Sequence, residues 1–275
     1  MRLGYNTNGM AHHDPVDAIE LLANVGYRSV AITVDQSTLN PFRNDWREQL
    51  ERIAAALKRF EMRSVIETGA RFLLDPSRKH WPTLMASQPE DRGRRVEFLR
   101  HCIDVAHHLE SDCVSLWSGV SDDDIELEGG LERLSKALGP VLAHAESVAI
   151  PIGFEPEPGM FIESMAHFER LLQWVDHPQL QLTLDVGHLY CLGEVPIADY
   201  VRRWSDRLVN VHMEDMCAGT HEHLMFGDGE MHFPPIIEAF RDVDYRGGVH
   251  VELSRHSHMA PEAVRLAFDF LSPLI

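Results

Sequence analysis

Cysteines and basic side chains are scarce in this sequence. Its 275 residues include four cysteines, and none of them forms a CxxC pair. Such sparse cysteines are typical of a protein from a reducing compartment and argue against a disulfide framework. Lys and Arg number 25 against 43 Asp and Glu, which gives a formal net charge of −18. Because a nucleic-acid surface needs clustered cations, nucleic acid is not expected as a partner.

Long hydrophobic runs are missing as well. No stretch reaches the roughly 18 consecutive apolar residues that a membrane span requires. Residues 1–9 (MRLGYNTNG) also lack the apolar core of a secretory signal. We therefore expect a cytoplasmic protein that has no membrane partner. Its content of 44% hydrophobic and 25% charged residues is ordinary for a folded domain.

Short apolar segments alternate with longer amphipathic segments along the chain. In residues 45–60, Leu50, Ile53, Ala54 and Leu57 recur at the spacing of one helix face. The expected strands are Arg2–Asn6, Ser29–Val34, Arg63–Glu67, Cys113–Trp117, Ile152–Glu155, Gln181–Asp185, Leu208–His212 and Gly248–Leu253. The expected helices are Pro15–Asn24, Asp45–Phe60, Arg94–Leu109, Leu131–Val148, Ser164–Val175, Ile197–Asp206, Pro234–Arg241 and Ala260–Leu271.

This alternation predicts an α/β fold, a (β/α)₈ TIM barrel that forms a single domain over residues 1–275. Strands that alternate with helices imply parallel pairing, and eight such units at this length imply closure into a barrel. A doubly wound open sheet is the alternative, but no GxGxxG motif follows the first strand. Two long loops, residues 68–91 and 213–233, are expected at the C-terminal face of the barrel, where active sites of this fold are built.

Four of the later strands end in a potential metal ligand: Glu155, Asp185, His212 and Glu252. A single polar residue at a strand end is most often a hydrogen-bonding or capping group, but four in successive units favour a shared site. Three converging carboxylates would repel one another without a cation. Oxygen-rich ligation with one imidazole suits Mn²⁺ best, with Mg²⁺, Co²⁺ or Zn²⁺ possible.

The second half of the chain carries motifs of a known family. They are FEPEPG at 154–159, LDVGH at 184–188, VHMED at 211–215, GDGE at 227–230 and VHVELS at 249–254. With these motifs the chain resembles the xylose-isomerase-like barrels. That group includes ketose 3-epimerases, hydroxypyruvate isomerase, inosose isomerases and dehydratases, and endonuclease IV.

The resemblance implies an enzyme that binds one divalent ion through the four strand-end residues. It also implies that Glu155 and Glu252 act as the catalytic acid–base pair and that His188 faces the substrate. The expected activity is isomerisation or epimerisation of a sugar, inosose or related polyhydroxy carbonyl compound, by proton abstraction to an enediolate. A homo-oligomer is possible on the same resemblance.

Three other functions stay open. The same groups could expel a hydroxyl and make the chain a dehydratase. A non-catalytic sugar-binding subunit is a second alternative, although it would be marked by a broken acid–base pair and both glutamates are present. An endonuclease IV-like DNA repair nuclease is disfavoured, because two of its metal-binding histidines correspond to Glu67 and Trp117, and an indole cannot ligate a metal.

The remaining candidate residues lie in the loops at the expected barrel mouth. Glu67, Arg71 and Arg255 are expected to contact the substrate. His221 and His223 belong to an HEH stretch that is expected to be a solvated loop, with a second metal site as the alternative.

Overall fold

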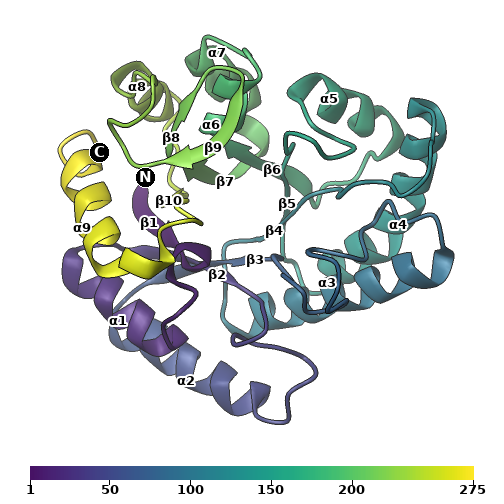
Figure 1. The fold of residues 1–275 in the computed structure, drawn as a ribbon, viewed down its shortest axis with the longest axis horizontal. Helices are drawn as coiled ribbons and strands as arrows, with labels where there is room; N and C mark the ends of the chain where they lie inside the picture. Colours follow the sequence, from purple (N-terminus) through teal and green to yellow (C-terminus); the bar gives the residue numbers. More distant parts are fainter.

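Eight parallel strands close into a barrel in the computed structural model, which describes residues 1–275 (Figure 1). Around the barrel they follow the order β1, β10, β7, β6, β5, β4, β3, β2. The predicted (β/α)₈ fold is confirmed. The barrel strands are β1 Arg2–Asn6, β2 Ser29–Thr33, β3 Arg63–Glu67, β4 Val114–Leu116, β5 Ile152–Phe154, β6 Leu180–Asp185, β7 Leu208–Met213 and β10 Gly248–Val251.

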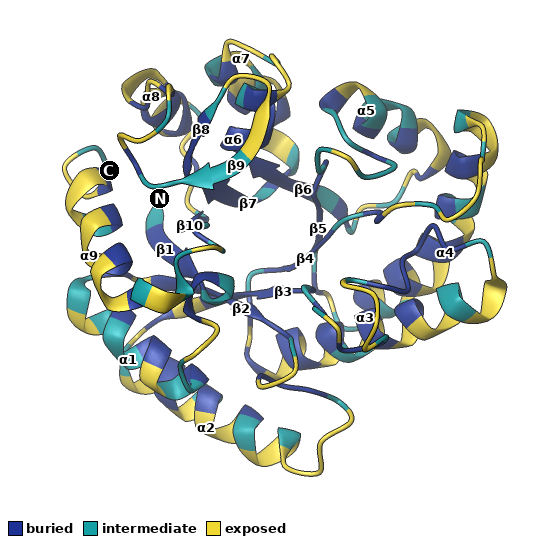
Figure 2. Cartoon of the chain, in the orientation of Figure 1, coloured by how far each residue is buried: buried dark blue, intermediate teal, exposed yellow.

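The main helices surround the barrel and bury the side that faces it (Figure 2). In α2 three of the four predicted inward residues, Leu50, Ile53 and Leu57, are buried, whereas Ala54 is half-buried and Ala56 is buried instead. None of the helices combines the length and apolarity that a bilayer crossing requires. The helices are α1 Pro15–Val25, α2 Trp46–Arg59, α3 Pro89–His108, α4 Leu127–Ser147, α5 Met165–Trp174, α7 Ile197–Trp204, α8 Pro234–Asp242 and α9 Ala260–Leu271.

Some elements differ from the prediction. Helix α3 begins at Pro89 rather than Arg94, because proline is favourable in the first turn of a helix. Residues 213–233 do not form a continuous loop, since they contain an antiparallel hairpin of β8 Asp215–Cys217 and β9 Thr220–Leu224. Polar β9 has no apolar alternation that would have revealed it. The additional short helices are α6 Val186–Cys191, η1 Thr7–Met10, η2 Ser205–Arg207 and η3 Ser257–Met259.

The strand register brings polar residues together at the C-terminal mouth. His212 in β7 pairs with Asp185 of β6 on one side and with His250 of β10 on the other. Glu67, the last residue of β3, pairs with Ser115 of β4. Parallel closure therefore carries polar groups from distant parts of the sequence into one site, as expected for the C-terminal face of this fold.

Candidate active site

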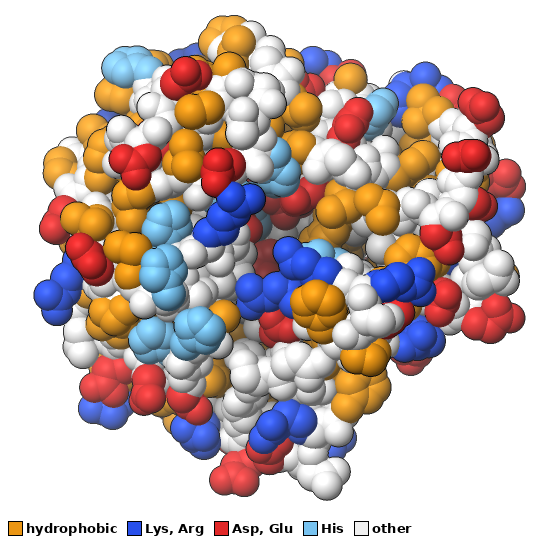
Figure 3. All heavy atoms as spheres, viewed as in Figure 1, with side chains coloured by type: hydrophobic (Ala, Val, Ile, Leu, Met, Phe, Trp, Pro, Cys, Tyr) orange, Lys and Arg blue, Asp and Glu red, His pale blue; other side chains and the backbone are white.

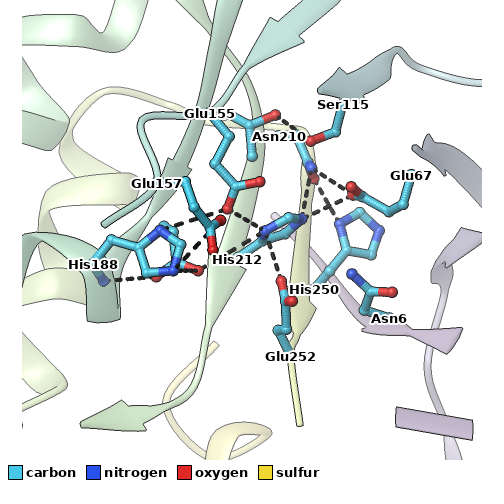
Figure 4. A network of polar contacts seen from close by, with 12 residues as sticks. Asn6, Glu67, Ser115, Glu155, Glu157, His188, Asn210, His212, His250 and Glu252 are labelled. Carbon is cyan, nitrogen blue, oxygen red and sulfur yellow. Dashed lines mark hydrogen bonds and ion pairs between the residues drawn. The ribbon is translucent and has the colours of Figure 1, made fainter. Parts of the chain in front are cut away.

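The four predicted metal ligands lie together at the barrel mouth. One side-chain atom from each of Glu155, Asp185, His212 and Glu252 lies within 4.8 Å of the others. Nδ1 of His212 is 3.0 Å from Oε1 of Glu155 and 2.9 Å from Oε2 of Glu252 (Figure 4). The same nitrogen is 3.9 Å from Oδ2 of Asp185. The structure thus brings together all four residues predicted from the strand ends.

This group has the chemistry of a cation site. Asp185 is buried, and its Oδ2 atom has no hydrogen-bond partner. Leaving a buried charged oxygen unpaired is costly. Three carboxylates and one imidazole are a donor set that divalent ions of the Mn²⁺ and Mg²⁺ type accept. The residues present therefore fit a divalent metal ion.

The two glutamates beside His212 have opposite pKa shifts. Burial raises the pKa of Glu155 to about 8, although the adjacent His212 opposes this. Burial would also raise the pKa of Glu252, but attraction to His212 and a hydrogen bond with it outweigh burial and lower that pKa. Burial would lower the pKa of His212, yet the carboxylates of Glu155, Glu67 and Glu252 raise it well above its usual value. A bound cation would displace the second ring proton that this raised pKa keeps on His212.

A polar cavity of about 350 Å³ lies above the cluster, and only two of its lining residues are hydrophobic. Three of the residues expected to contact the substrate line this cavity, namely Glu67, Arg71 and Arg255. Arg71 pairs with Asp35 at 2.6 Å, and Arg255 pairs with Glu222. Figure 3 shows Lys and Arg side chains beside the central hollow and Asp and Glu side chains deeper inside it.

His188 differs from those three residues, because it is buried and is not part of the cavity lining. Its Nε2 atom is 3.5 Å from Oδ2 of Asp185, and it also belongs to a second group of imidazoles with His221 and His223, whose nitrogens lie within 4.8 Å of one another. Nε2 of His188 is 3.1 Å from Nε2 of His221. The expectation of a solvated HEH loop is wrong, since both histidines lie on β9 and only the side chain of His221 is substantially exposed, at 31% against 13% for His223.

Comparison with known proteins agrees with this architecture. A family model of xylose isomerase-like TIM barrels matches residues 19–274. The chain belongs to this family. Inosose dehydratase from Lacticaseibacillus casei is 31% identical over 150 residues, which are 48% of this chain and 48% of that protein. The chain thus spans about half the length of this curated relative.

Two solved structures have the same fold as this chain. D-allulose 3-epimerase from a Methylomonas species has a TM-score of 0.77 at 18% identity, over 100% of this chain and 97% of that one. 3-Keto-D-glucoside 4-epimerase from E. coli has a TM-score of 0.79 at 16% identity, over 99% of each chain. At such identities the likeness concerns the barrel itself.

Sequence reasoning missed several polar residues at the site of this chain. Asn8 contacts Glu252, while Asn210 and His250 lie beside His212 inside the barrel. Glu214 is fully buried and neither of its carboxylate oxygens has a partner. A signal existed for His250, because it interrupts an otherwise apolar strand, and Asn210 lies two residues before His212 in β7.

Proposed function

We propose that this chain is a divalent-metal-dependent isomerase or epimerase of a sugar, inosose or related polyhydroxy carbonyl compound. The observation that carries the proposal is the position of Glu155 and Glu252 on either side of one nitrogen of His212. Their nearest oxygens are 3.0 Å and 2.9 Å from Nδ1, at the base of a polar cavity. Two carboxylates at one reaction centre can serve as base and acid in turn.

Glu155, Asp185, His212 and Glu252 would hold one divalent ion, and Mn²⁺ suits this donor set best. When bound, such an ion polarises a carbonyl and stabilises negative charge on its oxygen. The orphaned Oδ2 of Asp185 supports this assignment, because a cation would satisfy it.

The two glutamates would move the proton. They follow the first and last of four neighbouring strands, β5, β6, β7 and β10, with Glu155 after β5 and Glu252 after β10. One carboxylate removes the proton from the carbon next to the carbonyl, which leaves an enediolate. The other returns a proton to the opposite face of that carbon, which is epimerisation. Return of the proton to the neighbouring carbon, together with transfer of the hydroxyl proton from one oxygen of the enediolate to the other, is isomerisation.

Other residues would bind a small polyhydroxylated substrate. Arg71, Arg255 and Glu67 line the cavity and can bond to hydroxyl or acidic groups. His221 lines the cavity, and His188 lies behind it with its Nε2 atom 3.1 Å from that of His221. His188 would face the substrate from this position. We also propose a cytoplasmic location without a nucleic-acid or membrane partner, and all four cysteines are free thiols, as in a reducing compartment.

Dehydration is the second candidate reaction. The 31% identity with an inosose dehydratase favours it. Proton removal by one glutamate is shared with epimerisation. The hydroxyl on the next carbon then leaves as water, with a proton supplied by the other glutamate. A sugar-binding subunit without activity is less well supported, because both glutamates are in place. The nuclease alternative lacks support, since Trp117 lies in the cavity wall where a metal ligand would be needed.

Solvent deuterium exchange tests the proposal. The metal-loaded protein is incubated in D₂O with a panel of ketoses, inososes and keto-glycosides. We expect deuterium at the carbon next to the carbonyl of at least one compound, and the product identifies epimerisation, isomerisation or loss of water. A protein that binds a sugar tightly and never exchanges this proton would support the binding-subunit alternative instead.

A further inference from the structure

His212 lies between two sets of carboxylate oxygens. Its Nδ1 atom faces Glu155 and Glu252, while its Nε2 atom is 2.8 Å from Oε1 of Glu67 on the other side of the ring (Figure 4). An imidazole that ligates a metal through one nitrogen usually donates its other N–H to a carboxylate or carbonyl. The side on which the proton remains decides which nitrogen is the ligand.

A chain of buried hydrogen bonds sets the orientation of the groups around Glu67. Nδ1 of His250 is 2.8 Å from Oδ1 of Asn210, and Nε2 of His250 is 2.8 Å from Oγ of Ser29. If Ser29 donates to His250, then His250 donates to the Asn210 oxygen. The Asn210 amide nitrogen then lies 3.2 Å from Oε1 of Glu67 and 3.1 Å from Nε2 of His212. An amide nitrogen only donates, and the carboxylate oxygen of Glu67 is the acceptor that both nitrogens share. Glu67 therefore accepts from Asn210 on one side and from His212 on the other.

The ring of His250 is held in this orientation by close packing. It is completely buried in the barrel interior. A Cβ atom added at Gly4 or at Gly248 would lie 2.3 Å from a carbon of the ring, so glycine is needed on both sides. The close packing holds His250, which in turn holds Asn210 and Glu67.

We propose that Glu67 is a positioning residue that keeps the proton on Nε2 of His212, so that Nδ1 is the metal-ligating atom. This inference rests on the proposed function in one respect, namely that His212 helps to bind a divalent ion. Glu67 was expected from the sequence to contact the substrate, and it does line the cavity. The inference adds a role toward His212. Loss of a carboxylate that accepts a hydrogen bond from a metal-ligating histidine typically weakens metal binding by about 10-fold to 100-fold.

Calorimetric titration with Mn²⁺ tests the role of Glu67. We expect Glu67→Leu to weaken the affinity by about 10-fold to 100-fold. Glu67→Gln should fall between Glu67→Leu and the unaltered protein, because its amide oxygen still accepts the Nε2 proton. Asp35→Asn is the matched control, since Asp35 also carries a carboxylate near the mouth but contacts Arg71 instead of His212. Its Mn²⁺ affinity should change less than twofold.

The position of the proton gives a second readout that does not need a variant. In ¹⁵N-histidine NMR spectra of the unaltered protein with saturating Mg²⁺, Nε2 of His212 should remain protonated while Nδ1 shifts on binding. A folded Glu67→Leu protein with unchanged Mn²⁺ affinity would overturn this inference alone. Loss of the Nε2 proton on Mg²⁺ binding would do the same. An unaltered protein that binds no divalent ion would overturn the proposed function together with it.

Discussion

The side-chain amide of Asn8 donates a hydrogen bond to Oε1 of Glu252 across 2.7 Å, although the two residues are 244 positions apart in the sequence. Asn8 lies in η1, directly after β1, and Glu252 follows β10, which is the neighbour of β1 in the closed barrel. The bond restrains one oxygen of Glu252. The other oxygen remains directed at Nδ1 of His212, 2.9 Å away.

Removing the carboxylate charge of either glutamate should abolish the chemical step. Glu155→Gln and Glu252→Gln keep a neutral oxygen near the metal and lose the base. General acid–base catalysis typically contributes about 10²-fold to 10⁴-fold, and we expect a larger loss because the charge at the metal also changes. The rate of deuterium exchange into an accepted substrate measures the effect. Full activity of Glu252→Gln would refute the assigned site.

Asp185 and His212 should act mainly through metal occupancy. We expect Asp185→Asn and His212→Gln to bind Mn²⁺ more weakly and to recover part of their activity when the metal is supplied in excess. Metal content by atomic absorption, together with turnover at increasing Mn²⁺, separates this effect from loss of a base. A Glu155, Asp185 double alanine variant with normal metal content would contradict the ligand assignment.

His188, His221 and His223 offer three nitrogens to a second ion. A nitrogen-rich set suits Zn²⁺ better than Mn²⁺. If the alternative of a second metal site holds, the unaltered protein will bind two equivalents of Zn²⁺ and a His221→Ala, His223→Ala variant will bind one. Equal Zn²⁺ stoichiometry in both proteins would exclude a second site on these histidines.

Asp112 should stabilise the barrel away from the active site. Its two oxygens pair with Arg2 of β1 and Arg63 of β3, each at 2.5 Å, and its side chain is only 18% exposed. We expect Asp112→Asn to lower the free energy of unfolding by about 1–2 kcal/mol, as for a partly buried charged hydrogen bond. The exposed Arg43–Asp45 pair provides the control. Urea denaturation should show a smaller loss for Asp45→Asn than for Asp112→Asn.

Much of the fold could be predicted from the sequence because strand and helix patterns are local. The predicted bounds of β1, β3 and α9 agree with the structure to the residue. The four metal-ligand candidates could also be found, since barrel closure brings the ends of consecutive strands to one mouth whatever their side chains are. The β9 strand escaped prediction, because its polar residues THEHL carry no apolar periodicity.

The sequence by itself therefore determined the barrel, the order of its units and which strand ends face one another. Only the tertiary structure decided how the side chains are used. It directed Nε2 of His212 toward Glu67 and Nδ1 toward Glu252, and it buried His188 behind the cavity. These arrangements depend on contacts between strands far apart in the chain, and the orientation of a ring or an amide follows from hydrogen-bond partners that no local pattern specifies.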